Sequence, residues 1–78
     1  MRVLIVEDEA FLAEAIRARL ELDAIAADVA RDGDAALAAV ATNDYDVVVL
    51  DRDIPGVHGD DVCRRLAQEP VGPAVLML

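Results

Sequence analysis

The chain has 78 residues, enough for one small domain, and it is strongly acidic. It carries 16 acidic against 7 basic residues, a formal net charge of −9 at pH 7, and such a field repels the phosphate backbone of nucleic acids. We therefore expect no direct nucleic-acid binding. A single cysteine excludes a disulfide framework within the chain, and no apolar run reaches the roughly 18 residues of a membrane span. We expect a cytoplasmic protein without a membrane segment.

The first third of the sequence predicts a strand followed by a helix. Residues 2–6 (RVLIV) form a β-branched apolar run without a polar break, which is typical of a strand buried on both faces of a parallel sheet. Glu7, Asp8 and Glu9 follow it directly, and a helical pattern then covers residues 10–22. The apolar residues at helical spacing, which we expect to face inward, are Phe11, Leu12, Ala15, Ile16 and Leu20.

The middle of the sequence predicts a second strand and a second helix. Residues 24–30 (AIAADVA) have weak strand propensity, but they lie between two helical patterns and have turn-like ends. We interpret them as a short strand. Asp34 is the expected N-cap of a helix that runs to Thr42. Its expected inward residues are Ala36, Leu37 and Val40.

The last third repeats the alternation. Residues 47–50 (VVVL) predict another strand buried on both faces, and Asp51 follows it immediately. A Pro-Gly turn then precedes a third helix, which begins at Asp60 or Asp61. The expected apolar side of that helix consists of Val62, Cys63 and Leu66. Residues 74–78 (AVLML) predict a fourth strand, so the whole pattern indicates a parallel sheet with helices on both faces.

Two acidic clusters follow strands of this predicted sheet. Glu7 and Asp8 follow the first strand, and Asp51 follows the third. If the two strands are neighbours, their spacing of about 4.8 Å brings the three carboxylates together, where mutual repulsion has to be compensated. Mg²⁺ prefers such oxygen ligands, and the pattern indicates a metal-assisted phosphoryl site with Asp51 as the nucleophile. Taken in isolation, Asp51 also fits a simple turn-initiating aspartate.

The segments MRVLIVEDE and YDVVVLDRDIPGVHG, with the helices between them, resemble the receiver domain of two-component response regulators. The resemblance covers the whole chain but only about the first two-thirds of a receiver. It implies a flavodoxin-like (CheY-like) doubly wound parallel sheet with strand order 2-1-3-4-5, truncated here after the fourth strand. Residues 1–78 are then expected to form a partial receiver domain that lacks the fifth strand and the last two helices.

The resemblance also implies roles for particular residues. Asp51 matches the aspartate that takes a phosphoryl group from a sensor histidine kinase, which makes the domain a signalling phosphoacceptor and not an enzyme. Glu7 and Asp8 match the acidic pair that holds Mg²⁺, with Asp8 the more direct ligand, and Asp53 matches the residue that adds its main-chain carbonyl. The Ser or Thr and the Lys that complete a receiver site fall beyond residue 78. The parent protein is expected to be a transcriptional regulator, because receivers are commonly fused to DNA-binding domains.

Two alternatives stay open. A haloacid-dehalogenase-type phosphatase also has a hydrophobic strand followed by D-x-D, which Asp51 and Asp53 match, although the acidic pair after the first strand then has no role. A non-catalytic, self-associating half-domain is the other. A sequence that is 56% hydrophobic suggests a larger core than so short a chain encloses, and an exposed fourth strand invites pairing with a second copy. We therefore also expect a homodimer.

Overall fold

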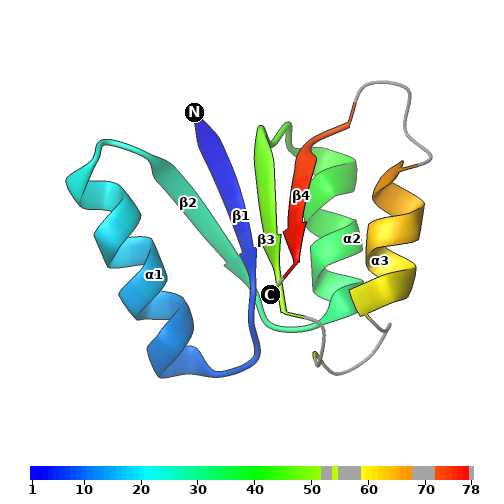
Figure 1. The fold of residues 1–78 in the computed structure, drawn as a ribbon, viewed down its shortest axis with the longest axis horizontal. Helices are drawn as coiled ribbons and strands as arrows, with labels where there is room; N and C mark the ends of the chain where they lie inside the picture. Colours follow the sequence, from blue (N-terminus) through cyan, green and yellow to red (C-terminus); the bar gives the residue numbers. More distant parts are fainter. Residues whose placement is uncertain (52–53, 55–58, 68–71, 78) are drawn as a thin grey trace.

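The structure, a computed structural model, describes residues 1–51, 54, 59–67 and 72–77, except for the side chains of residues 59, 60, 63 and 67. Strands and helices alternate along these residues, as the sequence predicts (Figure 1). The elements are β1 (Arg2–Val6), α1 (Ala10–Leu22), β2 (Ala26–Ala30), α2 (Gly33–Thr42), β3 (Val47–Leu50), α3 (Gly59–Ala67) and β4 (Ala74–Met77). None of the helices among the described residues is long and apolar enough to cross a membrane.

The four strands form one parallel sheet in the order β2-β1-β3-β4. This order confirms the doubly wound arrangement expected from the resemblance, as far as these strands extend. The last residue of β1, Val6, lies opposite Ala30 of β2 and Leu50 of β3. The residues that follow β1 and β3 therefore leave the sheet side by side at its carboxyl edge.

One face of the sheet forms the main core with α2 and α3. Alternate strand residues, among them Leu4 and Val48, lie in a buried cluster with Val62 and Leu66 of α3. The last two were expected on the apolar side of α3, whereas the side chain of Cys63 is outside the described residues. Leu37 and Val40 of α2 are partly buried against this cluster, as the helical pattern predicts.

Helix α1 covers the other face, where it contacts β1 and β2. Strand β1 is buried on both of its faces, because Val3 and Ile5 are as inaccessible as their neighbours. The prediction for α1 itself was partly wrong. Ile16 and Leu20 are half-buried, but Phe11 is 84% exposed and Leu12 43% exposed, and Ala15 is exposed too. Ala13, which was not in the predicted face, is the buried residue of the helix.

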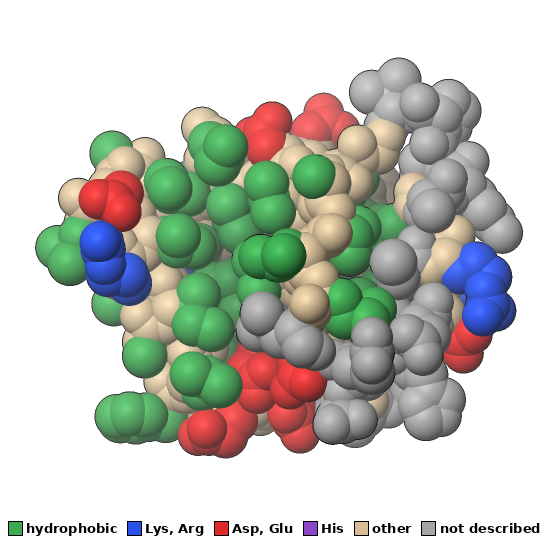
Figure 2. Space-filling view, viewed as in Figure 1, with side chains coloured by type: hydrophobic (Ala, Val, Ile, Leu, Met, Phe, Trp, Pro, Cys, Tyr) green, Lys and Arg blue, Asp and Glu red, His purple; other side chains and the backbone are tan. Residues whose placement is uncertain are grey.

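The α1 side of the sheet is only partly covered. In β3, Val48 and Leu50 are fully buried, whereas Val47 and Val49 on the other face are half-buried. On the same side of β4, Ala74 is exposed and Leu76 is 56% exposed. Burial of β3 on both faces was therefore predicted too strongly. Figure 2 looks onto this side, with α2 behind β4, and shows hydrophobic side chains spread across the middle of the face.

Two element boundaries also differ from the expectation. Asp32, not Asp34, is the N-cap of α2, because its Oδ1 accepts the N–H of Ala35 at 2.7 Å. Strand β2 begins at Ala26, and Ala24, predicted as strand, has a φ of +58°. The N–H groups of Ala24 and Ile25 donate to the carbonyls of Glu21 and Leu20, each at 3.0 Å. This pair of bonds is the Schellman arrangement that ends a helix.

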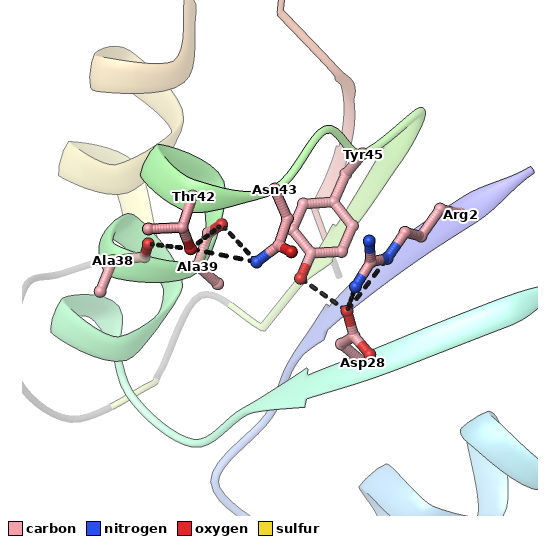
Figure 3. A network of polar contacts seen from close by, with 7 residues as sticks. All are labelled: Arg2, Asp28, Ala38, Ala39, Thr42, Asn43 and Tyr45. Atoms are coloured by element: carbon pink, nitrogen blue, oxygen red, sulfur yellow. Dashed lines mark hydrogen bonds and ion pairs between the residues drawn. The ribbon is translucent and has the colours of Figure 1, made fainter.

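A polar network connects the sheet near the edge at which the strands begin (Figure 3). Oδ2 of Asp28 accepts two hydrogen bonds, one from Nη2 of Arg2 at 2.8 Å and one from the hydroxyl of Tyr45 at 2.7 Å. The Arg2 guanidinium also lies 5.3 Å from the centre of the Tyr45 ring, within cation–π range. The network therefore ties β1, β2 and the residues before β3 together at the end of the sheet opposite Asp51.

Candidate metal and phosphoacceptor site

The backbone fixes both acidic loops immediately after their strands. The N–H of Asp51 donates to the carbonyl of Val6, and the N–H of Glu7 donates to the carbonyl of Ala30, each at 3.0 Å. These bonds continue the parallel ladder by one residue past β3 and β1. Glu7 and Asp51 therefore extend from backbone positions that are still hydrogen-bonded to the sheet.

The carboxylates of Glu7, Asp8 and Asp51 converge at this edge. One oxygen of each lies within 4.8 Å of the others. The three differ in exposure: Glu7 is 5% exposed, Asp51 is half-buried and Asp8 is exposed. The sequence indicated this convergence from strand adjacency, but it gave no sign that Glu7 would be the buried member.

Burial of Glu7 has an electrostatic consequence. Loss of hydration raises the pKa of its carboxyl group above the ordinary value, and a hydrogen bond with Asp51 and the nearby charges raise it further. The N–H of Glu9, which donates to Oε1 of Glu7 at 3.3 Å, acts in the opposite direction. Ionising all three carboxylates therefore lowers the stability of the folded chain, and a bound cation would offset this loss by neutralising their charge.

The donor set fits a hard divalent cation. All three side chains offer carboxylate oxygens, the ligands that Mg²⁺ takes. Their graded exposure leaves one side of the cluster open to solvent, where a further oxygen ligand can approach. The fourth expected ligand, the carbonyl of Asp53, lies outside the described residues.

A parallel α/β sheet of order β2-β1-β3-β4, with acidic residues converging after its two central strands, is the arrangement of a receiver domain. The sequence profile of the response regulator receiver domain matches residues 3–78. The chain belongs to this family. The phosphatase alternative leaves the acidic residues after β1 without a role, and Asp53, on which that alternative also depends, lies outside the described residues.

Similar proteins agree with this assignment. The chain is 58% identical over all of its 78 residues to the transcriptional regulatory protein CutR of Streptomyces coelicolor, of which it covers 36%. It therefore spans about a third of the length of this curated relative. Among solved structures, the receiver domain of the Francisella response regulator 1452 has a TM-score of 0.91 and 32% identity, over 97% of this chain and 63% of that one. The response regulator TrrA of Thermotoga maritima, solved in complex with Mg²⁺-BeF, has a TM-score of 0.84 and 30% identity, over 88% of this chain and 60% of that one.

Proposed function

We propose that the chain is the phosphoacceptor part of a response regulator, in which Asp51 takes a phosphoryl group from the phosphohistidine of a sensor histidine kinase. The observation that carries the proposal is the convergence of Glu7, Asp8 and Asp51 within 4.8 Å at the carboxyl edge of the sheet, in a member of the receiver family. On this proposal residues 1–78 are a partial receiver domain. The parent protein then regulates transcription, as the printed name of the relative CutR says of that protein, and we propose that it does so in the cytoplasm.

The role of each residue follows from its position. An oxygen of Asp51 forms a bond to phosphorus while the phosphorus–nitrogen bond of the donor breaks, and the imidazole nitrogen keeps the electron pair. Glu7, Asp8, Asp51 and the carbonyl of Asp53 would hold Mg²⁺, which supplies positive charge to the phosphoryl oxygens. Asp51 is half-buried, so one side of its carboxylate is accessible to a donor. The chain is then modified in a signalling reaction and does not act as an enzyme on a substrate.

Intact-mass measurement tests the phosphoacceptor proposal directly. The chain is incubated with Mg²⁺ and acetyl phosphate, alongside the variants Asp51→Asn and Asp34→Asn. Asp34, whose carboxylate is exposed at the start of α2, provides the control. We expect one phosphoryl group on the parent chain and on Asp34→Asn, and none on Asp51→Asn. Omitting Mg²⁺ should abolish the addition. A phosphoryl group that persists in Asp51→Asn would overturn the assignment of the acceptor.

A second proposal concerns self-association. We propose that the 78-residue chain forms a homodimer through β4 and the partly covered sheet face on the α1 side. Within the described residues β4 pairs only with β3, and the open edge lies beside the 56% exposed side chain of Leu76. An open edge with apolar neighbours favours pairing with a second copy. The net charge of −9 makes a nucleic acid the wrong partner for this surface.

Sedimentation equilibrium of paired variants tests the dimer. Leu76→Asp puts a charge on the proposed interface, whereas Leu22→Asp puts the same charge on a side chain that is 81% exposed at the end of α1. We expect a dimer for the parent chain and for Leu22→Asp, and a monomer for Leu76→Asp. A folded monomer in all three samples at micromolar concentration would rule the dimer out.

A further inference from the structure

A pocket of about 840 Å³ opens between α2 and α3, far from the three carboxylates. Asp46 precedes β3 and Pro73 precedes β4, so the pocket lies at the edge where the strands begin. Because the strands are parallel, this is the edge opposite Asp51. Its volume falls within the range of about 300–1,000 Å³ that ligand sites occupy. We call it the α2–α3 pocket. Its principal lining residues are Leu37, Val40, Asp44, Asp46, Arg65 and Leu66.

The inner wall of the α2–α3 pocket is apolar. Leu37 and Val40 are only half-buried although they pack against the core, so part of each faces the pocket. Leu66 of α3 is 4% exposed and closes the wall from the other helix. An aliphatic side chain that entered here would remove apolar surface from water on both partners, which is favourable.

Most polar groups near this wall already have partners. The Tyr45 hydroxyl donates to Asp28, and the Asn43 amide nitrogen donates to the carbonyl of Ala39 at 3.2 Å (Figure 3). Asp44 and Arg65 differ, because within the part of the chain that the structure describes neither side chain makes a hydrogen bond or an ion pair. Asp46 uses one carboxylate oxygen, Oδ2, for the N–H of Arg2 at 2.8 Å.

The charges at the rim select the ligand. Two of the three charged lining residues are carboxylates, in a chain of net charge −9, so a cation is attracted both by the rim and by the molecule as a whole. Arg65 has donors for a main-chain carbonyl. An apolar wall, two carboxylates and one guanidinium together match a basic peptide with aliphatic side chains better than an anion or a purely apolar ligand.

We propose that the α2–α3 pocket binds a short extended segment of a partner protein, in which an aliphatic side chain contacts Leu37, Val40 and Leu66 and a neighbouring lysine or arginine pairs with Asp44 and Asp46. The guanidinium of Arg65 donates to a carbonyl of the segment. The pocket lies at the opposite edge from Asp51, so this interaction is separate from phosphoryl transfer. It gives the chain a second recognition surface.

Chemical-shift titration of the ¹⁵N-labelled chain tests this proposal. The probe is the peptide N-acetyl-Leu-Lys-Leu-Lys-amide, and its controls replace both lysines with glutamate or both leucines with glycine. We expect amide shifts confined to residues 37–46, 65 and 66. In a proton spectrum the ring signals of Tyr45, the only tyrosine of the chain, should move as well. The two control peptides should leave these signals unchanged.

Two matched variants test whether the carboxylate of Asp44 contributes to binding of the probe peptide. Asp44→Asn should weaken binding of the probe about two- to five-fold, the effect of one exposed ion pair, whereas Asp34→Asn removes the same charge at the other end of α2 and should have no effect. Equal binding of the glutamate peptide would overturn the proposal. So would shifts centred on Glu7, Asp8 and Asp51, which would mean general attraction of lysine to an acidic protein.

Discussion

Burial of Glu7 favours the protonated side chain, whereas the proposed metal site needs the same side chain as a carboxylate. Glu7 is 5% exposed beside Asp51, and its raised pKa means that the folded chain binds this proton more tightly than the unfolded chain does. Between the unfolded and folded pKa values the folded state then carries more protons, so the free energy of unfolding falls as pH rises. The metal-free chain is therefore destabilised near neutral pH by a carboxylate that a cation would stabilise.

The substitution Glu7→Gln separates these two effects. Without Mg²⁺ we expect the variant to unfold at a higher temperature than the parent chain at pH 7, with the two curves converging near pH 4. Mg²⁺ should bind the variant more weakly, because one of the three converging carboxylates is lost. Melting curves at pH 4–8, with and without Mg²⁺, measure both. A variant that is less stable than the parent chain at pH 7 without metal would contradict this interpretation.

Ala24 is a residue whose backbone conformation favours another amino acid. Its φ of +58° is costly for a side chain with a Cβ atom, by roughly 1–2 kcal/mol, and glycine is the usual residue at this position of a Schellman motif. We expect Ala24→Gly to raise the free energy of unfolding by about 1 kcal/mol. Ala26→Gly, at the start of β2, should lower it. Urea denaturation compares the two, and an equal loss in both would argue against a strained Ala24.

At the scale of the elements, helix α2 depends on a cap that the sequence analysis assigned to the wrong aspartate, Asp34 instead of Asp32. Asp32 and Asp34 both stand where a helix can begin, but only the Asp32 side chain accepts a main-chain N–H. We expect Asp32→Ala to cost about 1 kcal/mol of stability. Asp34→Ala should cost less, because only its favourable interaction with the helix dipole is lost. Thermal unfolding of the pair distinguishes them, and the reverse order would restore the original prediction of Asp34 as the cap.

Element types and topology could be predicted because they depend on strong local patterns. The β-branched runs at residues 2–6 and 47–50 are too short for helices and are typical of strands, and their parallel arrangement follows from the helices between them. The inward face of α1 could not be predicted as well. This helix is rich in alanine and has apolar residues on more than one side, so periodicity does not choose between them. Close packing on the sheet instead selects the small Ala13, and Phe11 is left exposed.

The same distinction applies to the site. The convergence of Glu7, Asp8 and Asp51 follows from strand order, which a sequence pattern constrains. The burial of Glu7 and its hydrogen bond with Asp51 depend on side-chain packing at the end of β1. No spacing rule contains that information. The α2–α3 pocket was missed for the same reason, since its lining comes from two helices and two loops.

On the scale of the whole molecule, the excess of negative charge lowers the stability of the folded state. A net charge of −9 on 78 residues produces self-repulsion, which destabilises the folded state. Raising NaCl from about 0.01 M to 0.1 M shortens the Debye length from about 30 Å to about 10 Å. We therefore expect the unfolding temperature to rise over this range. Thermal melts at fixed pH and protein concentration measure it, and an unfolding temperature that falls would show that attractive ion pairs such as Arg2–Asp28 dominate instead.

The central position of β1 has a consequence for synthesis of the chain. Its partners are residues 26–30 on one side and residues 47–50 on the other. Across 44 positions of sequence, the main-chain N–H of Arg2 donates to the Asp46 carboxylate and the main-chain N–H of Asp46 donates to the carbonyl of Arg2. During synthesis β1 therefore cannot pair fully with β3 until Leu50 has been made. During that interval the apolar segment RVLIV has an unpaired edge, a state prone to aggregation. The strand at the centre of the finished sheet is therefore one whose second edge stays unpaired until β3 has been made.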